Sequence, residues 1–522
     1  MASCVLAWNG SINTHLMNST PALPRSRRRR ALSLSVRITR IFIVLYFCLA
    51  FGAYLTNPFV RFTLVKDPFS SQLGNDLQLQ LTQQNDLRIR SGRIVEALGF
   101  AKSAQHMVSN VYVGGKRSHS TELENIIHDI HQLRFNPAQP FLISGDHFSV
   151  LYIRSLGIFY HSLLDPRTAL DETDWLNRQR IYLQTTAYAL DVFAQSDILS
   201  TTIVPVGPRS VTLMNVYRAP SDSLYSLLYA LSIMKGDPLL ENIYPIPSKN
   251  VSYTLNTQTA AEALIQQYHD PLQRHLVNYL SYVLEPSTGL VKRNILLSGT
   301  KDVTKRQSSF YDNVILWRTQ QLAQQLGLEP ESPENLAELK TKILQNFWMP
   351  DQGCFLEDLS DEGKANRYYS SDWLIALMTG FLDPSNPDER PYFVECVKYI
   401  QRQELDQPFG LKYQQTPRAN RQYLPVRLFA PSYGTTTIWS NWGMEYVKLL
   451  VRLYDTTGEQ QYLETARKQL DSYTQNILTT RCYPEVYDLQ GKLYRRPLYQ
   501  SVCQTGWVVT YEEANMMVES RP

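Results

Sequence analysis

Apolar residues recur at helical spacing through most of the chain. In "NWGMEYVKLLVRLYD", the apolar side chains between Tyr446 and Leu453 fall on one face of a helix. The segment "SSFYDNVILWRTQQLAQQLGL" begins with Ser308 and Ser309, which suit a helix cap, and stops at Gly327. Together with similar segments, these predict about twelve helices and an all-α fold. The similar segments begin near Glu122, Arg154, Asp171, Pro220, Thr257, Glu334, Ser370, Arg390, Gln460 and Cys503.

The stretches between the predicted helices are long and rich in Tyr, Pro, Arg and Asp, as in "KYQQTPRANRQYLPVRLFAPSYG". Helix pairs joined by such loops favour a stacked or closed array of helical hairpins. No fixed short repeat is present, which disfavours a TPR or HEAT solenoid. No long linker interrupts residues 86–522, which we interpret as one domain. Its loops are the expected place for a functional site.

The N-terminal region has the pattern of a membrane anchor. Residues 41–60, "IFIVLYFCLAFGAYLTNPFV", carry no charge, and such a run is long enough to cross ~30 Å of hydrocarbon. Most of the flanking positive charge, including "RSRRRR", lies before this run, which places the N-terminus in the cytoplasm. We therefore expect a disordered basic cytoplasmic tail at 1–40, a transmembrane signal-anchor helix at 41–60 and a polar stalk at 61–85. A cleaved signal peptide is disfavoured because no clear small-x-small site ends the run.

Composition excludes several classes of function. The net charge is +3, so no overall field favours nucleic acid. The nine histidines show no metal-ligand spacing, and there is no Cys-x-x-Cys pair, so neither a metal site nor a redox site is expected. No Gly-rich phosphate-binding motif is present, and we expect no cofactor. Cys482 and Cys503 could form a disulfide or remain free thiols, and the sequence leaves both possibilities open.

Two loop carboxylates could carry acid–base chemistry on a sugar. Hydrolysis of a glycosidic bond needs one protonated carboxyl and one carboxylate. Asp302, in "SGTKDVTKRQSSFYDN", follows a Ser-Gly turn and is the first candidate for the acid, with Asp312 as the second. Glu485, in "CYPEVYDLQG", lies among aromatic residues that suit sugar stacking. Each of these residues could also be an ordinary loop carboxylate. Lys301 must point away from Asp302 if that residue is to remain protonated.

Several segments resemble the six-hairpin (α/α)6-toroid glycosidases, in particular the trehalase and processing α-glucosidase group. They are "SGTKD" before "FYDN", "YGTTTIWSNWGMEYVKLLVRLYD" and "PEVYDLQG" with "YQSVCQTGWVV". The resemblance implies an (α/α)6 toroid with Asp302 as general acid and Glu485 as general base. The chain has Leu297 where the family usually has Glu, and one additional residue before Asp302, which indicates a diverged member.

The resemblance and the loop chemistry suggest further substrate-binding residues. For Asp222, capping of a helix is the alternative interpretation, and for Asp372 it is capping by Ser370 or Ser371. The expected substrate-binding residues are Asp146, Arg154, Arg218, Asp222, Tyr433, Trp439, Gln504 and Trp507.

These patterns predict a membrane-anchored glycoside hydrolase on the extracytoplasmic side. It would be inverting and would act on an α-linked glucoside or another short saccharide. One alternative is a membrane-tethered toroid that binds glycans without cleaving them. A lyase or phosphorylase on the same fold is another alternative, and it would need a Tyr/His pair or a phosphate-binding cluster.

Overall fold

The computed structural model describes residues 88–89, 117–132, 141–145, 150–159, 161–164, 169, 171–207, 210–236, 257–301, 304–328, 335–497 and 499–522. By contacts the chain divides into two compact units, Met1–Leu55 and Thr56–Pro522, and every described residue belongs to the second. The predicted tail, membrane helix and stalk, at 1–40, 41–60 and 61–85, lie outside the described residues. Among the described helices, none is long and apolar enough to cross a membrane.

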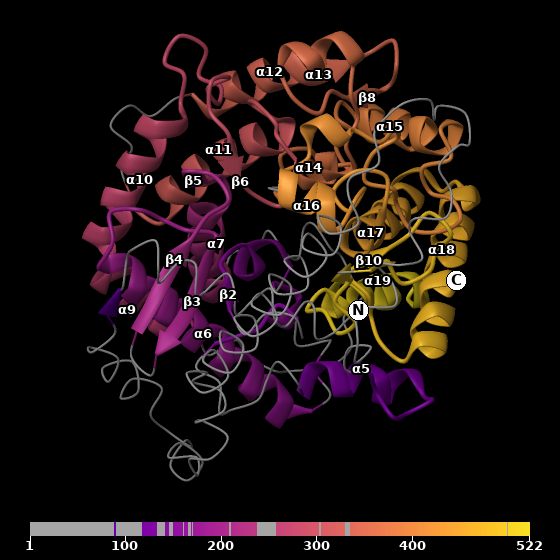
Figure 1. Cartoon of the computed structure of the whole chain (residues 1–522), viewed down its shortest axis with the longest axis horizontal. Coiled ribbons are helices and arrows are strands. Elements are labelled where there is room, and N and C mark those ends of the chain that lie inside the picture. Colours follow the sequence, from indigo (N-terminus) through magenta and orange to yellow (C-terminus); the bar gives the residue numbers. More distant parts are fainter. Residues whose placement is uncertain are drawn as a thin grey trace, which may run out of the picture. The chain divides into compact units, whose positions relative to one another are not determined.

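A closed ring of helical segments forms the inner layer of the second unit (Figure 1). Along the ring, each segment contacts the next one in chain order, and the last, α19, returns to contact η4. The segments are η3 (Ser155–Phe159) with η4 (His161–Leu164), α7 (Ser223–Lys235), α11 (Phe310–Gln325), η6 (Ser371–Leu374) with α14 (Ile375–Met378), α17 (Ser440–Thr457) and α19 (Val508–Glu519).

Outer helices alternate with these inner segments along the chain (Figure 1). This alternation and the closure of the inner ring are the connectivity of an (α/α)6 toroid, so the predicted fold class is confirmed for the described unit. The outer helices are α5 (Leu123–Gln132), α6 (Glu172–Ala194), α9 (Gln258–Gln267) with α10 (His269–Val283), α12 (Leu336–Phe347), α15 (Arg390–Arg402) and α18 (Gln460–Thr480).

Burial distinguishes the two layers. In α7, every residue from Ser223 to Met234 is buried, because this helix is covered on all sides. In the outer helix α12, the buried residues are only Leu339, Ile343 and Phe347, spaced to form a single stripe that faces the ring.

Local sequence sets the limits of α11 as predicted. The hydroxyl of Ser309 accepts a hydrogen bond from the backbone N–H of Asp312, which caps the helix. After the helix, Gly327 adopts a φ of +75°, a left-handed conformation that glycine permits at no steric cost.

Short helices and short strands lie between the ring helices. The short helices are α13 (Asp361–Asn366), η7 (Ala419–Arg421) and α16 (Leu424–Phe429). One sheet has the order β1-β4-β3-β2, from β1 (Arg88–Ile89), β2 (Leu151–Tyr152), β3 (Thr202–Gly207) and β4 (Ser210–Met214). Its β3–β4 hairpin is a feature that the all-α prediction missed, because it lies in one of the long stretches between predicted helices.

Pairs of two-residue strands connect loops that are distant in the sequence. The pair β9·β10 joins the beginning of α17 to the loop before α19, and β5·β6 joins the loops before α7 and α11. The pairs are β5 (Ala219–Pro220) with β6 (Leu297–Ser298), β7 (Trp348–Met349) with β8 (Cys354–Phe355), β9 (Ile438–Trp439) with β10 (Val486–Tyr487), and β11 (Arg495–Arg496) with β12 (Tyr499–Gln500).

Candidate active site

The loop that carries Glu485 is fixed against the N-terminal end of α17. Val486 pairs with Trp439 in the β9·β10 ladder. The backbone N–H and the hydroxyl of Ser440 each donate a hydrogen bond to the carbonyl of Glu485, both at 3.0 Å. On its other side, the N–H of Glu485 donates to the carbonyl of Val502 at 3.0 Å. The backbone of Glu485 is therefore anchored to two segments.

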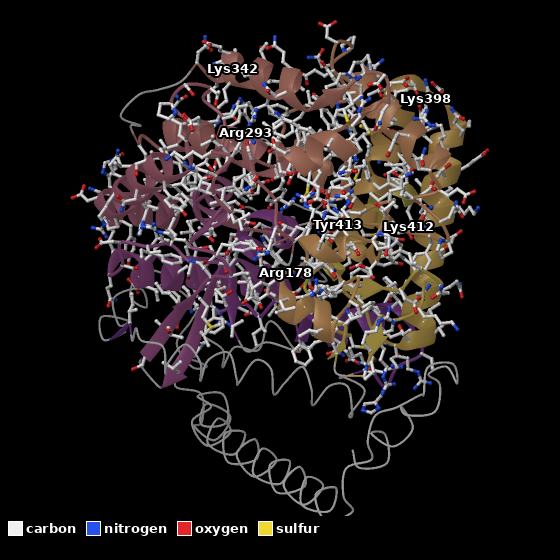
Figure 2. All side chains as sticks on the ribbon, turned by 45° about the horizontal axis from the view of Figure 1, so that its top comes forward. Arg178, Arg293, Lys342, Lys398, Lys412 and Tyr413 are labelled. Atoms are coloured by element: carbon white, nitrogen blue, oxygen red, sulfur yellow. A yellow bond between two sulfur atoms is a disulfide. The ribbon has the colours of Figure 1, made fainter. Side chains whose placement is uncertain are left out.

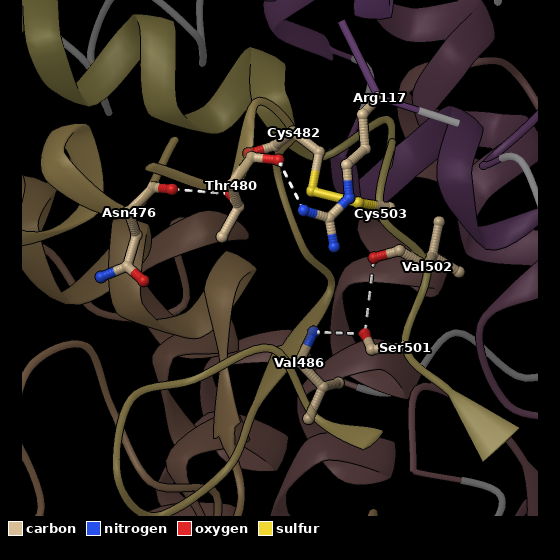
Figure 3. The surroundings of a disulfide bond; sticks show 8 residues. All are labelled: Arg117, Asn476, Thr480, Cys482, Val486, Ser501, Val502 and Cys503. Atoms are coloured by element: carbon tan, nitrogen blue, oxygen red, sulfur yellow. Dashed lines mark hydrogen bonds between the residues drawn. A yellow bond between two sulfur atoms is a disulfide. The ribbon is translucent and has the colours of Figure 1, made fainter. Parts of the chain in front are cut away.

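A disulfide closes the same loop (Figure 3). Cys482 and Cys503 are 21 residues apart in sequence, and their Cα atoms lie 5.4 Å apart. Of the two possibilities that the sequence left open, the structure therefore shows the bridge. Within the closed loop, the hydroxyl of Ser501 accepts a hydrogen bond from the N–H of Val486 at 2.9 Å (Figure 3).

The carboxylate of Glu485 is held by one member of a group of four neighbouring aromatic residues, Tyr433, Trp439, Tyr499 and Trp507, which we call the aromatic cluster. The phenol of Tyr433 donates a hydrogen bond of 2.6 Å to Oε2 of Glu485. The Tyr433 ring centroid lies 5.0 Å from that of Trp439 and 5.2 Å from that of Tyr499. The centroids of Trp439 and Trp507 are 5.8 Å apart. Burial raises the pKa of Tyr433 well above its ordinary value, so this phenol stays protonated and remains a donor.

Glu485 itself remains partly exposed, whereas the rings of Trp439, Tyr499 and Trp507 are buried. Gln504, another predicted substrate-binding residue, is 3% exposed. Its side-chain oxygen has no hydrogen-bond partner within the described part of the chain. Buried polar atoms are nearly always hydrogen-bonded, so this oxygen suits a ligand or an ordered water as its partner.

A buried ion network lies beside the turn that contains Lys301. The ammonium of Lys301 donates to Oε1 of Glu357 at 2.5 Å and to the hydroxyl of Ser370 at 3.0 Å. It also lies 4.3 Å from the centroid of the Tyr413 ring, a residue that Figure 2 labels. Burial lowers the pKa of Lys301 to about 8, although the charge of Glu357 opposes this effect.

Glu357 is the centre of this network. Its second carboxylate oxygen pairs with Arg418 and lies 3.4 Å from Nη1 of Arg421, and Arg421 also pairs with Asp358. Burial alone would raise the pKa of Glu357, but Lys301, Arg418 and Arg421 together lower it below its ordinary value. Glu357 is therefore an anion that neutralises buried cations.

Two further carboxylates are enclosed near the beginnings of inner helices. Asp372 forms an ion pair with Arg306. Ser370 is the N-cap residue of η6, but its side chain makes no cap hydrogen bond. Asp312, the second candidate for the acid, is 5% exposed and accepts a hydrogen bond of 2.6 Å from the hydroxyl of Ser309. Burial raises the pKa of Asp312, and the charge of Arg306 opposes that rise.

Asp222 occupies the N-cap position of α7, as the capping interpretation expects, but its side chain makes no cap hydrogen bond there. Its fully buried carboxylate accepts a hydrogen bond of 3.0 Å from the phenol of Tyr311. That phenol accepts a bond of 2.6 Å from the hydroxyl of Thr300. The carboxylate of Asp222 is thus connected to the Ser-Gly turn through a chain of hydroxyl groups.

The two predicted arginines lie in different surroundings. Arg154 donates a hydrogen bond of 2.5 Å to the carbonyl of Gly299, so it supports the same Ser-Gly turn as Asp222. Arg218 is exposed, and its guanidinium lies 5.4 Å from the ring centroid of Tyr282 on the outer helix α10. The structure does not join Arg218 to the aromatic cluster by a described contact.

Asp302 and Asp146 lie outside the described residues, but their neighbours are placed. The hydroxyl of Thr304 donates to the carbonyl of Gly434 at 3.2 Å, which sets the end of the turn beside the Tyr433 loop. Gly145 pairs with Thr505 in a β-bridge just before α19. Described residues that flank the two predicted positions therefore contact segments near the aromatic cluster.

Sequence reasoning missed the residues that surround Glu357. The adjacent acids in "CFLEDLS" and the arginines spaced by three in "TPRANRQ" were the available signals. These signals could not be interpreted from the sequence, because the ion pairs join distant segments. Arg418 lies 61 residues from Glu357, and Lys301 lies 56 residues from it.

The chain matches no protein-family model and no curated protein sequence. Among solved structures it is similar to a rhamnosidase from Klebsiella oxytoca with rhamnose bound, with 14% identity, a TM-score of 0.47, and coverage of 76% of this chain and 64% of that one. A glucoamylase from Saccharomycopsis fibuligera has 10% identity and a TM-score of 0.47, over 78% and 98% of the two chains. A cellobiose 2-epimerase from Spirochaeta thermophila has 10% identity and a TM-score of 0.46, over 76% and 97%. Similarity this distant assigns neither substrate nor mechanism to this chain.

Proposed function

We propose that the chain is a glycoside hydrolase in which Glu485 is the general base and Asp302 the general acid. The observation that carries the proposal is the setting of Glu485. Glu485 is partly exposed, and its carboxylate accepts a hydrogen bond of 2.6 Å from the phenol of Tyr433, a member of the aromatic cluster. Within the cluster Tyr433 is partly exposed, so its ring can meet a sugar, and a carboxylate held beside it can accept a proton from water.

In the proposed reaction, water attacks the anomeric carbon as the glycosidic C–O bond breaks. The water gives a proton to the carboxylate of Glu485, and Asp302 gives its proton to the leaving oxygen. The oxygen of the water forms the new bond, so the product sugar carries a hydroxyl of inverted configuration. The substrate class, an α-linked glucoside or a related short saccharide, follows from the sequence resemblance.

The ion network supports the role of Asp302 as an acid. The cation next to it in sequence, Lys301, is directed into a buried pair with Glu357. Its charge is therefore neutralised within the protein and does not oppose a protonated carboxyl at the neighbouring residue.

Buried polar atoms near the beginnings of inner helices support a ligand rich in hydroxyls. The amide of Asn441 in α17 and the hydroxyl of Ser371 in η6 have no hydrogen-bond partner within the described residues, and both residues are 0% exposed. Gln504 adds an unpartnered buried oxygen before α19. Sugar hydroxyls can both donate and accept, so they suit such a set of groups.

A toroid that binds glycans without cleaving them is the second candidate. It is favoured by the internal pairing of Asp222, Asp312 and Asp372, because each of these carboxylates already contacts a polar group of the protein. Leu297, at the position where the resembling enzymes usually have Glu, also favours it.

We also propose that residues 41–60 anchor the toroid to a membrane and that the toroid lies on the extracytoplasmic side. The disulfide between Cys482 and Cys503 supports this location, because such bonds persist in oxidising compartments. Deletion of residues 41–60 should move the chain from the membrane fraction to the soluble fraction. A chain that remains in the membrane fraction after the deletion would refute the anchor.

Release of sugar from a panel of α-glucosides by the purified full chain tests the reaction. We expect Glu485→Gln and Asp302→Asn each to lose roughly 10³-fold in rate, the loss typical of removing a general acid or base. Asp312→Asn is the matched control and should retain activity. If Asp302→Asn retains activity and Asp312→Asn does not, the acid is Asp312. Binding of sugar without turnover in the unmodified chain would establish the second candidate. The anomer released first, observed by NMR, distinguishes inversion from retention.

A further inference from the structure

A pocket with a volume of about 670 Å³ lies between the outer helix α12 and the turns on either side of the Ser-Gly segment. Small-molecule sites commonly enclose roughly 300–1,000 Å³, so the pocket has the size of a ligand site. Leu290, Val291 and Leu359 supply an apolar surface, and Ser308 completes the wall. None of the lining residues belongs to the aromatic cluster, so the pocket is separate from the Glu485 site.

An exposed cation, Arg293, lines the pocket. The guanidinium of Arg293 is exposed and makes no hydrogen bond or ion pair with any described residue. Lys364 of α13 lies close enough to Arg293 for the two charges to repel. The pKa of Lys364 is lowered, first by burial and then by this repulsion, while the charge of Asp361 opposes the shift. Two like charges held together in this way attract an anion.

A second cation reaches the pocket from α12. Lys342 lines it, and Figure 2 shows Lys342 and Arg293 in the same part of the molecule. The ammonium of Lys342 pairs with Glu338 at 3.0 Å, but the two side chains are 37% and 61% exposed. An exposed pair of this kind contributes little to stability, so the ammonium is available to an incoming ligand.

Polar side chains with hydrogen-bonding capacity surround the two cations. Asn294 and Asn346 offer amide groups, and Thr288 offers a hydroxyl. Glu285 also lines the pocket, and its carboxylate accepts a hydrogen bond of 3.3 Å from the hydroxyl of Ser287. A carboxylate in this position suits a hydroxyl group of a ligand and opposes a purely anionic one.

We propose that this pocket binds an anionic sugar. Its phosphate or carboxylate would lie on Arg293 and Lys342, because the planar guanidinium matches either group with two parallel hydrogen bonds. Its hydroxyls would bond to Asn294, Asn346 and Glu285. This binding does not depend on hydrolysis at Glu485, so the experiment below tests it independently of the proposed function.

Isothermal titration calorimetry on the purified full chain tests the proposal with four probes, which are glucose 6-phosphate, glucuronate, glucose and inorganic phosphate. We expect glucose 6-phosphate or glucuronate to bind, and the tighter of the two identifies the anionic group. Arg293→Gln should weaken that binding by about tenfold or more, and Lys342→Gln should also weaken it.

Lys398→Gln is the matched control. Lys398 also pairs with a glutamate of its own outer helix, Glu395 at 2.8 Å, but it does not line the pocket (Figure 2). Equal weakening by Lys398→Gln would show a diffuse charge effect and would overturn the proposal. Glucose binding as tightly as the anionic sugars, inorganic phosphate binding as tightly as glucose 6-phosphate, or no binding of any probe would also overturn it.

Discussion

The phenol of Tyr433 donates a hydrogen bond of 2.6 Å to the carboxylate of Glu485, although 52 residues separate them in sequence. The bond joins the loop before α17 to the loop before α19. The β9·β10 ladder connects the same two loops. Tyr433 therefore orients the carboxylate that we propose as the general base.

Replacing Tyr433 by Phe should lower kcat by roughly tenfold and leave KM nearly unchanged. Without the phenol, the carboxylate of Glu485 is less often oriented to accept the proton of the attacking water. Tyr494→Phe is the matched control. The ring of Tyr494 lies 5.9 Å from that of Tyr433, and its hydroxyl donates to the carbonyl of Pro431. Steady-state kinetics on both variants checks the prediction, and an equal loss in the two would contradict a specific role for Tyr433.

The disulfide between Cys482 and Cys503 should stabilise the fold by lowering the conformational entropy of the unfolded chain. For a closed loop of this length, the chain-entropy estimate is about 3 kcal/mol. Cys482→Ser combined with Cys503→Ser should lower the free energy of unfolding in urea by that amount. A reducing agent should lower the stability of the unmodified chain similarly and leave the double variant unchanged. An equal effect of the reducing agent on both proteins would show that another bond is responsible.

The sequence predicts those parts of the fold that depend on neighbouring residues. Ser309 caps α11 and Gly327 follows its end, because both effects act within one turn of the chain. The β3–β4 hairpin was missed because Thr202 pairs with Met214 across a turn that has no strong hairpin signal.

The site was less predictable than the fold because its chemistry depends on long-range contacts. The sequence predicts a cap at Asp222, yet its carboxylate accepts a hydrogen bond from the phenol of Tyr311, 89 residues away. Glu357 gave no signal of its own, since its role comes from Lys301 and Arg418 in other loops. The neighbourhood of Glu485 was easier to predict, because its aromatic partners lie partly in the same loop.

The closure of the ring should depend on Gly157 in η3. A Cβ atom at this position would lie 2.5 Å from Cα of Ser226 on α7, a backbone atom that cannot move aside. Gly157→Ala should therefore lower the free energy of unfolding by roughly 1–3 kcal/mol, the usual effect of overpacking. Leu176→Ala on α6 is the control, since Leu176 is 48% exposed and its truncation should change stability by less than about 0.5 kcal/mol. Equal stability of Gly157→Ala and the unmodified chain would contradict the close packing of η3 on α7.

The contributions of two buried lysines to stability should differ in their dependence on pH. The pKa of Lys301 is lowered by burial from 10.5 to about 8, whereas that of Lys448 is raised, because Glu445 and Glu513 outweigh the effect of its burial. Between pH 8 and 10.5, the unfolded chain keeps the proton that folded Lys301 has released. Since the unfolded state then binds more protons, the contribution of Lys301 to stability should rise with pH across this window.

The rise is isolated by subtracting the free energy of unfolding of Lys301→Met from that of the unmodified chain at pH 7.5, 8.5 and 9.5. This difference should stay nearly flat near pH 7.5 and then increase by up to about 1.4 kcal/mol per pH unit. The same difference for Lys448→Met should be constant, because Lys448 remains protonated in both states below pH 10. A flat difference for Lys301, or equal slopes for the two lysines, would show that burial of the Lys301–Glu357 pair does not favour the neutral amine.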